Sequence, residues 1–295
     1  MTQIQIKNKV DKSYDLINSK YKLSIVEQKL VLSIISLVRK EDDEFKNYYI
    51  PINQFSFLTD NRNGVRLKKH CKNLMSKPLE IKTPKGWKLF NWFSHIEYDN
   101  TSSTIECSIS PHLKPYLLQM QENFKSYDLQ YILNMQSEYS IRIYEMLKKS
   151  EKIGYLLINL VELEELLKVP KSYKRYDNFK KKVLQVSSLE LAKYSDIYYD
   201  LEELKTGRKV TELKFKIHKN KHNLVEEDDY EFNEFRSNIL LNYEGKRVFY
   251  HSNLDRNIIV KNSLLVIEES NKIIEKSRAK ELWNFMFNHQ NLILE

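Results

Sequence analysis

The chain has 295 residues, with 48 Lys and Arg against 40 Asp and Glu, and a formal net charge of +8 at pH 7. Its apolar share of 41% and charged share of 30% are typical of a globular protein and exclude a wholly disordered chain. The five glycines stand apart from one another, which excludes the glycine-rich phosphate loops of standard dinucleotide-binding and P-loop enzymes. The length favours two domains with an additional segment.

Cysteine content and hydropathy indicate where the protein resides. Cys71 and Cys107 are far apart and form no Cys-x-x-Cys pair, so neither a zinc ribbon nor a redox pair is indicated, and a reducing compartment is favoured. The N-terminal residues lack the apolar core of a signal peptide, and the most apolar run, near residues 30–38, is too short to cross a bilayer. We therefore expect a cytoplasmic protein that does not bind membranes.

The positive charge is confined to the first three quarters of the chain. Residues 221–295 hold 10 basic and 13 acidic residues, whereas residues 1–220 hold 38 basic and 27 acidic residues. A basic body of this kind favours a polyanionic partner, of which nucleic acid is the commonest.

Elements of the first half follow from capping and periodicity. Ser24 and Glu27 form a capping box ahead of an apolar helix over residues 23–38. The further predicted elements are a strand over 48–52, a short helix over 53–59, a basic helix over 65–75, strands over 79–82, 88–98 and 104–109, and a helix from Pro111. The last two strands are predicted to form a hairpin across the polar residues between them.

The second half repeats this order. Its predicted elements are a helix over 137–150 with Ser137 as cap, a strand over 155–158, a helix over 160–168, a loop over 170–175, a basic helix over 176–188, and a hairpin of strands 197–203 and 210–219. The polar residues 121–128 are predicted to join the halves. Residues 49–53 align with residues 155–159 at an offset of 106, which supports a duplication.

A helix, a strand, a short helix, a basic helix and a hairpin in that order are typical of a winged helix. We therefore predict an α+β fold with two tandem winged-helix domains and a C-terminal extension. The predicted boundaries are 1–120, 121–220 and 221–295. In the extension, a strand is predicted over 258–268 and a helix over 270–288.

The basic helix of each half is the candidate DNA-binding element, because such a helix needs one apolar face and one cationic face. In the second half, Tyr176, Phe179, Val183 and Val186 share the predicted inner stripe. Six of the twelve residues from Lys171 to Lys182 are basic. The candidate DNA-binding residues of this half are Lys171, Lys174, Arg175, Asn178, Lys180, Lys181, Lys182 and Gln185, with Lys205 and Arg208 at the turn of the wing.

In the first half, Leu67, Cys71 and Leu74 form the predicted inner stripe. Its candidate DNA-binding residues, predicted to point outward or sideways, are Arg62, Arg66, Lys69, Lys72 and Asn73. A basic helix standing alone is most often a solvated surface. Its recurrence at the same place in two similar halves favours DNA recognition.

No set of residues is selected as catalytic, metal-binding or cofactor-binding. A nicking enzyme needs a nucleophilic tyrosine and a metal held by closely spaced histidines, but none of the seven histidines forms His-x-His. His218 and His222 are four residues apart where a strand pattern leads into a polar loop, which disfavours a metal site. Trp87, Trp92 and Phe93 lie in strand patterns and are interpreted as core residues.

Four stretches resemble the iteron-binding initiator replication proteins of theta-replicating bacterial plasmids, and together they span roughly residues 9–219. The stretches are LINSKYKLSIVEQKLVLSIISLV, WFSHIEYDNTSSTIECSISPHLKPYLLQM, FKSYDLQYILNMQSEYSIRIYEMLKK and YKRYDNFKKKVLQ. The most specific part is residues 92–149. The tail, residues 220–295, carries no such resemblance.

This resemblance implies two pseudo-symmetric winged-helix domains and a function without catalysis. The protein would bind repeated double-stranded sites at a plasmid origin, promote opening of the duplex and recruit the host initiator and replicative helicase. The second domain would make the main sequence-specific contact, on residues 174–185, and the first would serve DNA contact and dimerisation. Monomers would initiate, and dimers would repress the protein's own promoter and so limit plasmid copy number. The alternatives are a winged-helix transcriptional repressor and a nicking endonuclease-type initiator.

Overall fold

The computed structural model describes residues 8–39, 42–52, 63–118, 123–220, 247–251, 256–261, 264–267 and 272–273. The chain divides into two compact units, Met1–Leu224 and Val225–Glu295. The short helix expected over 53–59 and the candidate residue Arg62 lie outside the described residues. In the part of the chain that is described, every helix is too short or too polar to span a bilayer.

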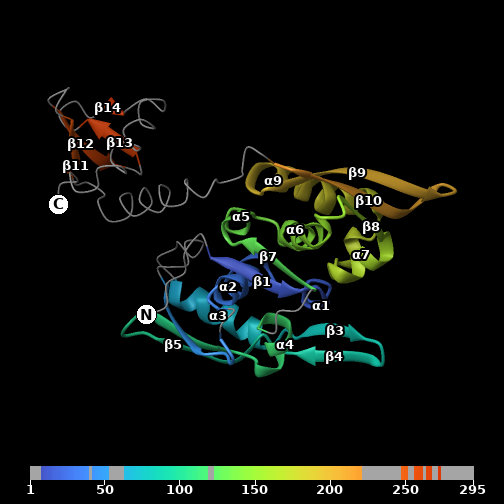
Figure 1. Ribbon diagram of the computed structural model, residues 1–295, viewed down its shortest axis with the longest axis horizontal. Helices are drawn as coiled ribbons and strands as arrows, with labels where there is room; N and C mark the ends of the chain where they lie inside the picture. Colours follow the sequence, from blue (N-terminus) through green and yellow to red (C-terminus); the bar gives the residue numbers. More distant parts are fainter. Residues whose placement is uncertain are drawn as a thin grey trace. The chain divides into compact units, whose positions relative to one another are not determined.

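The first half of unit 1 alternates short helices and antiparallel strands (Figure 1). Its elements are β1 (Lys9–Ser13), α1 (Tyr14–Ile17), α2 (Ile25–Ile35), β2 (Asn47–Pro51), α3 (Asn63–Met75), β3 (Leu79–Thr83), β4 (Gly86–Phe90), β5 (Phe93–Asp99), β6 (Thr104–Ile109), the 3₁₀ turn η2 (Pro111–Leu113) and α4 (Lys114–Leu117). The predicted helix, strand and basic helix are therefore present in the predicted order.

The second half begins with a strand that returns to the first. Its elements are β7 (Phe124–Asp128), α5 (Gln130–Leu133), α6 (Glu138–Ser150), β8 (Tyr155–Asn159), α7 (Leu160–Leu166), the 3₁₀ turn η3 (Lys171–Tyr173), α8 (Tyr176–Phe179), the π turn η4 (Lys180–Leu184), α9 (Gln185–Tyr194), β9 (Ile197–Thr206) and β10 (Lys209–Lys219). β7 pairs antiparallel with β1. The interpretation of residues 121–128 as a joining segment is therefore wrong for residues 124–128.

The two halves have sheets of the same topology. The first sheet has the strand order β2-β6-β5, and the second has the order β8-β10-β9. In each, the strand that follows the first long helix pairs with the second strand of a later hairpin, as in a winged helix. The offset of 106 residues seen in the sequence places Ile52 and Ile158 at the ends of the two short strands, and both side chains are buried. The duplication predicted from the order of elements is thus present in the topology.

The helix α2 begins at the predicted capping box. The side chain of Ser24 accepts a hydrogen bond from the backbone of Glu27, and the Glu27 carboxylate accepts one from the backbone N–H of Ser24 at 2.8 Å. Glu27 is fully buried and also accepts from Lys77 Nζ at 2.7 Å. Burial raises the pKa of Glu27, hydrogen bonds from Lys77, Ser24 and Asn73 lower it, and the net direction is down. The capping box therefore also links α2 to the end of α3.

We expect Ser24→Ala to lower the free energy of unfolding of unit 1 by about 1 kcal/mol, because one backbone donor at the start of α2 loses its acceptor. Urea denaturation followed by circular dichroism measures this loss. Ser24→Thr keeps the hydroxyl and should retain most of the stability. Equal losses in the two variants would show that the cap does not account for the effect.

The region between α3 and β6 differs from the prediction. The single strand expected over 88–98 is two strands, β4 and β5, which belong to different sheets. β4 pairs with β3 in a separate two-stranded hairpin, and β5 pairs with β6. The break falls at Asn91 and Trp92, where Trp92 is 1% exposed and its carbonyl accepts from Ser110 N at 3.0 Å. The chain changes direction here because the indole of Trp92 is buried, although the alternation of apolar and polar residues continues through this point.

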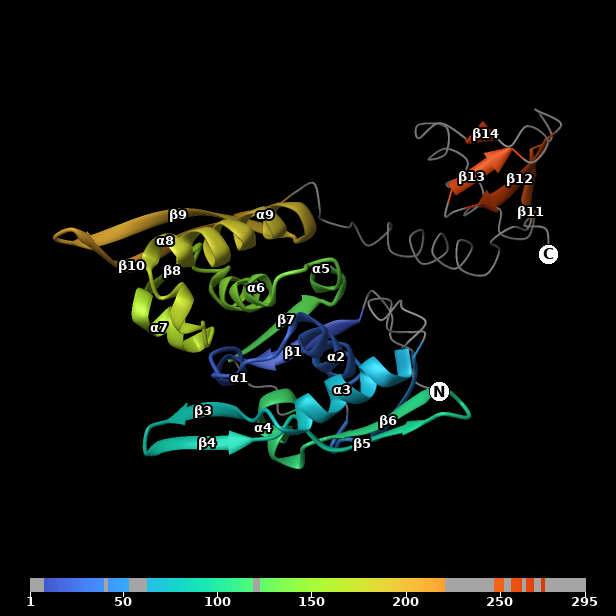
Figure 2. The same cartoon turned by 180° about the vertical axis from the view of Figure 1, so that it is seen from behind.

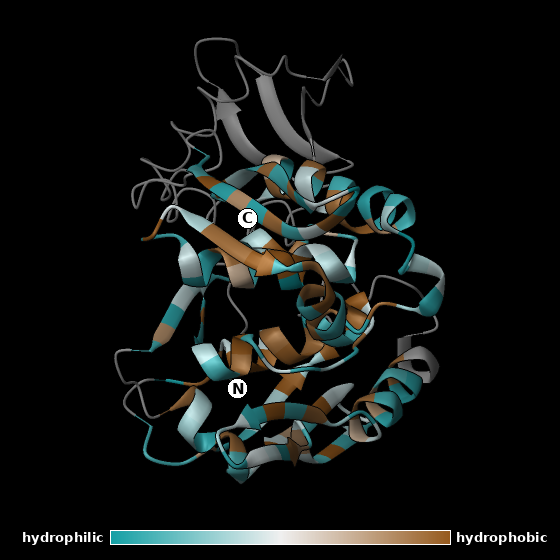
Figure 3. Cartoon of the chain, turned by 90° about the vertical axis from the view of Figure 1, so that its right-hand side faces the viewer, coloured by the Kyte–Doolittle hydropathy of each residue, from teal (hydrophilic) through white to brown (hydrophobic). Residues whose placement is uncertain are grey.

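One helix, α6, forms the wall shared by both halves. Most of its residues are buried, including charged ones, so it is surrounded by protein rather than packed on one side only. On one side it contacts α1 and β7, and on the other it contacts α9 and β8. Figure 3 shows the hydrophobic segments of unit 1 gathered toward its interior. The two winged helices therefore share one continuous core.

A buried ionic cluster fixes α6 to the first half. Glu145 is fully buried and accepts hydrogen bonds from Lys12 Nζ at 2.7 Å, Arg142 Nη1 at 3.2 Å and the Tyr127 hydroxyl. Arg142 also donates to the Tyr21 hydroxyl at 2.8 Å, and its guanidinium lies 4.1 Å from the centre of that ring. Buried charges of opposite sign that hydrogen-bond to one another hold one geometry, because any displacement leaves a charge unpaired.

Unit 2 contains an antiparallel sheet. Its strands, in the spatial order β11-β12-β13-β14, are β11 (Arg247–His251), β12 (Arg256–Lys261), β13 (Leu264–Ile267) and β14 (Lys272–Ile273). The single strand expected over 258–268 is therefore two strands. The helix expected over 270–288 is wrong at residues 272–273, which are β14, and its remaining residues lie outside the described part of the chain.

Candidate nucleic-acid interface

The basic segment of the second half is a continuous helix made of α8, the π turn η4 and α9. Phe179 and Val183 are fully buried, as predicted. The next buried positions are Leu184, at the end of the π turn, and Ser187 and Leu191 beyond it, whereas Val186 is only half-buried. The extra residue in a π turn shifts the helix face, so the regular spacing that placed Val186 on the inner stripe is wrong there.

The outer surface of this helix and of the loop before it is cationic and exposed. The exposed candidate residues are Lys171, Lys174, Arg175, Asn178, Lys181, Lys182 and Gln185. Phe179 and Lys181 lie on opposite sides, the arrangement that recognition of a major groove requires.

Local contacts orient two candidate side chains. Lys180 is half-buried, and its Nζ lies 2.7 Å from the Glu203 carboxylate on β9. The Asn178 amide donates to the Ser172 carbonyl at 3.0 Å, which fixes the preceding loop against the helix. Sequence reasoning did not select Glu203, because its contact with Lys180 depends on the wing folding back against the helix. Lys180 therefore joins helix to wing, and Lys181 and Lys182 form the more accessible cationic surface.

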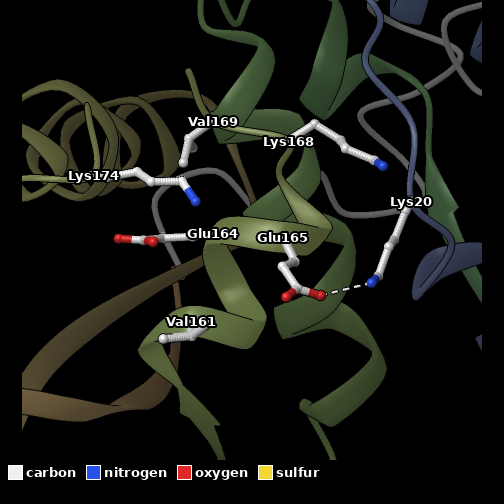
Figure 4. A pocket seen from close by; sticks show the side chains of 7 residues that line it. All are labelled: Lys20, Val161, Glu164, Glu165, Lys168, Val169 and Lys174. Atoms are coloured by element: carbon white, nitrogen blue, oxygen red, sulfur yellow. Dashed lines mark hydrogen bonds and ion pairs between the residues drawn. The ribbon is translucent and has the colours of Figure 1, made fainter. Parts of the chain in front are cut away.

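Lys174 lies in the loop before α8, as predicted, and is exposed. It also lines a pocket of about 260 Å³ together with residues of α7 (Figure 4). In the same pocket Lys20 Nζ is 2.7 Å from the Glu165 carboxylate. Burial raises the pKa of Glu164 and the charge of Lys174 opposes that rise, and the net direction is up. Lys174 is thus close to acidic side chains of α7 as well as to the start of the basic helix.

The wing of the second half is the hairpin of β9 and β10. Lys205 lies within β9, which ends at Thr206, and only Gly207 and Arg208 form the turn. The turn is therefore shorter than the expected one, which began at Lys205. Gly207 has a φ of 63°, a left-handed conformation that glycine adopts without strain. Lys205 and Arg208 are both exposed at the tip, where they are accessible to a phosphate backbone.

The basic helix of the first half, α3, has the predicted inner stripe. Leu67 and Leu74 are buried, and Cys71 packs against the core. Lys69 and Lys72 are exposed. Asn73 was expected to point outward but is half-buried, and its side chain is hydrogen-bonded to Glu27. Arg66 lies within α3.

The described residues also include two thiols and a cluster of possible metal ligands. Cys71 and Cys107 are free thiols, and burial raises the pKa of Cys71 to about 11 and that of Cys107 to about 12. Thiols with such values are inert at neutral pH. Among the described residues, His95, Glu97 and Glu106 place possible ligand atoms within 4.8 Å of one another on the solvent side of β5 and β6.

Comparison with known proteins agrees with this geometry. The family model described as "Initiator Replication protein, WH1" matches residues 9–148, and the one described as "Initiator Rep protein, WH2" matches residues 159–217. A curated replication initiation protein from Escherichia coli is 29% identical over 224 residues, which are 70% of this chain and 69% of the relative. The predicted fold, with two tandem winged-helix domains, is confirmed by these matches.

A solved structure has the same arrangement. The crystal structure of the Pi initiator protein in complex with iteron DNA superposes with a TM-score of 0.62 at 18% identity, and covers 74% of this chain and 99% of that chain. At this identity the likeness establishes the fold. It includes both winged helices, because the match extends over nearly all of the Pi chain.

Proposed function

The chain belongs to the family of initiator replication proteins, and from this membership we propose that it binds repeated double-stranded sites at a plasmid origin and opens the adjacent duplex. The observation that carries the proposal is the presence of an exposed basic helix in each of two winged-helix modules of the same topology. Two modules on one rigid body can read two successive major grooves of one duplex. That the Pi initiator was solved with iteron DNA supports repeated sites as the ligand.

Within this function the two modules have different tasks. The second, residues 121–220, makes the main sequence-specific contact through Lys181, Lys182 and Gln185. The first, residues 1–120, contributes Lys69 and Lys72 and serves dimerisation. Phosphate contacts from the lysines position the protein, and base contacts provide specificity.

Opening of the origin requires no catalytic group. Binding energy from several occupied sites can bend and untwist the DNA between them, and A·T-rich DNA deforms at low cost. The opened strand then receives the replicative helicase through the host initiator. Monomers initiate, and dimers repress the promoter of the protein's own gene, which limits copy number.

The test is to incubate the whole protein with supercoiled plasmid that carries the DNA flanking its gene, with and without Mg²⁺. We expect footprints at tandem direct repeats and permanganate-reactive thymines in an A·T-rich segment, with the plasmid remaining covalently closed. The matched control is the same plasmid with the repeats scrambled.

Other outcomes would contradict the proposal. A nicked plasmid would indicate an endonuclease. Occupancy of one inverted repeat without reactive thymines would indicate a repressor alone.

A further inference from the structure

The hairpin of β3 and β4 is an addition to the first winged helix. In the second half, α9 ends at Tyr194 and β9 begins at Ile197, so the recognition helix leads directly into the wing. In the first half, α3 ends at Met75 and the equivalent strand, β5, begins only at Phe93. The strand orders β2-β6-β5 and β8-β10-β9 show that β5 and β6 are the wing. The β3–β4 hairpin therefore has a task that the winged-helix fold alone does not require.

One face of this hairpin packs on the core, and the other faces solvent. Leu79 and Ile81 are buried, and Phe90 packs against Tyr116 with ring centres 5.8 Å apart. On the opposite face, Trp87 is 66% exposed and Leu89 is 51% exposed. The interpretation of Trp87 as a core residue is therefore wrong, whereas Trp92 is buried as predicted. The base of the hairpin is anchored, and its tip presents an indole to water.

The surroundings of Trp87 are cationic. Lys82 lies directly opposite Trp87 in the strand register, and Lys85 lies in the turn two residues before it. Lys88 is paired with buried Ile81 and therefore extends from the other face. Glu80 lies on the face of Trp87 but opposite Leu89, farther from the tip. All three lysines are exposed. An exposed indole among lysines fits a ligand that offers planar apolar faces and negative charges at short intervals.

Single-stranded DNA has both features. Its unpaired bases offer faces on which aromatic side chains stack, and its phosphates attract lysines. In an intact duplex the base faces are covered by their neighbours, so an indole at the surface can contact only edges and backbone. The hairpins β3–β4 and β9–β10 extend toward the same end of unit 1 (Figure 1 and Figure 2). The β3–β4 tip therefore lies at the end of the unit where the second wing lies.

We propose that the tip of the β3–β4 hairpin binds single-stranded DNA, with Trp87 stacked on an unpaired base and Lys82 and Lys85 placed against phosphates. The proposal rests on the proposed function, because an initiator that opens a duplex creates such a strand. It adds a second DNA site that is distinct from the two basic helices. Holding one strand would keep the opened segment from closing again.

The experiment compares the full chain with its Trp87→Ala and Trp87→Phe variants. Fluorescence anisotropy measures the Kd for a labelled 20-nucleotide thymidine oligomer and, separately, for a duplex with the repeats that flank the gene. We expect Trp87→Ala to bind the oligomer about 5- to 150-fold more weakly. Trp87→Phe retains a stacking ring and should recover most of the affinity. Duplex affinity should change less than about twofold in both variants, since Trp87 is absent from the two recognition helices.

Leu89→Ala is the matched control, because Leu89 is the other exposed apolar residue on the same face of β4. It should leave oligomer binding unchanged, and thermal unfolding should show that all variants are folded. Unchanged oligomer binding in Trp87→Ala would overturn the proposal. An equal loss of affinity for oligomer and duplex would also overturn it, because the hairpin would then belong to the duplex contact. A changed oligomeric state with unchanged DNA binding would overturn it as well. A wild-type chain that binds the oligomer but not the repeat duplex would contradict the proposed function and leave this site standing.

Discussion

Glu145→Ala should lower the free energy of unfolding of unit 1 by about 3–5 kcal/mol, because it leaves two buried cations without their shared acceptor. Lys12 and Arg142 both reach the Glu145 carboxylate, and all three side chains are 3% exposed or less. Urea denaturation at pH 7 measures the loss. The control is Glu165→Ala, which breaks the exposed pair with Lys20 and should cost much less, because water screens an exposed ion pair. A small loss at Glu145 would show that the cluster does not fix α6.

The same cluster predicts a dependence on pH. Burial raises the pKa of Glu145, the charges of Lys12 and Arg142 lower it, and the net direction is down. A carboxyl group whose pKa is lower in the folded state than in the unfolded state stabilises the fold above the unfolded value of about 4.3. This stabilisation is lost as the pH falls further. The difference in stability between the wild type and Glu145→Gln should therefore be full at pH 7 and shrink below about pH 4.

Lys181→Glu should weaken binding to the repeat duplex by about 5- to 150-fold, which corresponds to the loss of about 1–3 kcal/mol expected for one good base contact. Lys181 is exposed on the face of the recognition helix opposite to buried Phe179. The substitution should therefore change the free energy of unfolding by no more than about 0.5 kcal/mol. Gel-shift titration at fixed salt, with a scrambled duplex for comparison, measures the effect.

Lys193→Glu is the matched control, because it makes the same change in net charge at an exposed position of the same helix. Lys193 lies twelve residues beyond Lys181, about 18 Å along the helix axis. It should reduce binding to the repeat and scrambled duplexes by similar small factors. If the two substitutions weaken repeat binding equally, general electrostatic attraction explains the affinity, and the assignment of Lys181 to base recognition is wrong.

The parts of the fold that local signals determine could be predicted from the sequence. The capping box at Ser24 marks the start of α2, and Gly207 lies in the turn of the second wing. The two sheets follow from an order of elements that occurs twice. The strand break at Trp92 could not be predicted, because the alternation of apolar and polar residues continues through this position. Only the burial of the indole in the core determines where the strand ends. The pairing of β7 with β1 is equally non-local.

The sequence predicted which side of the basic helix is buried and which is exposed, but not the partners of individual side chains. Apolar periodicity identified Phe179 and Val183 as the inner side, so the outward direction of Lys181 followed. Partners from distant segments changed other positions: Glu203 on the wing engages Lys180, and Glu27 on α2 engages Asn73. Trp87 follows a glycine and lies between two lysines, which is a local indication of an exposed turn. The strand pattern around it nevertheless favoured a core position.

The π turn at Lys180–Leu184 constrains how this helix can be exchanged between proteins. A π turn accommodates one extra residue, so the segments before and after it keep the faces that they would have in a regular helix one residue shorter. In a regular helix the same extra residue would instead rotate every later side chain by about 100°. A transplant of residues 176–194 should therefore keep Phe179 and Leu191 on one buried face only if the π turn is preserved.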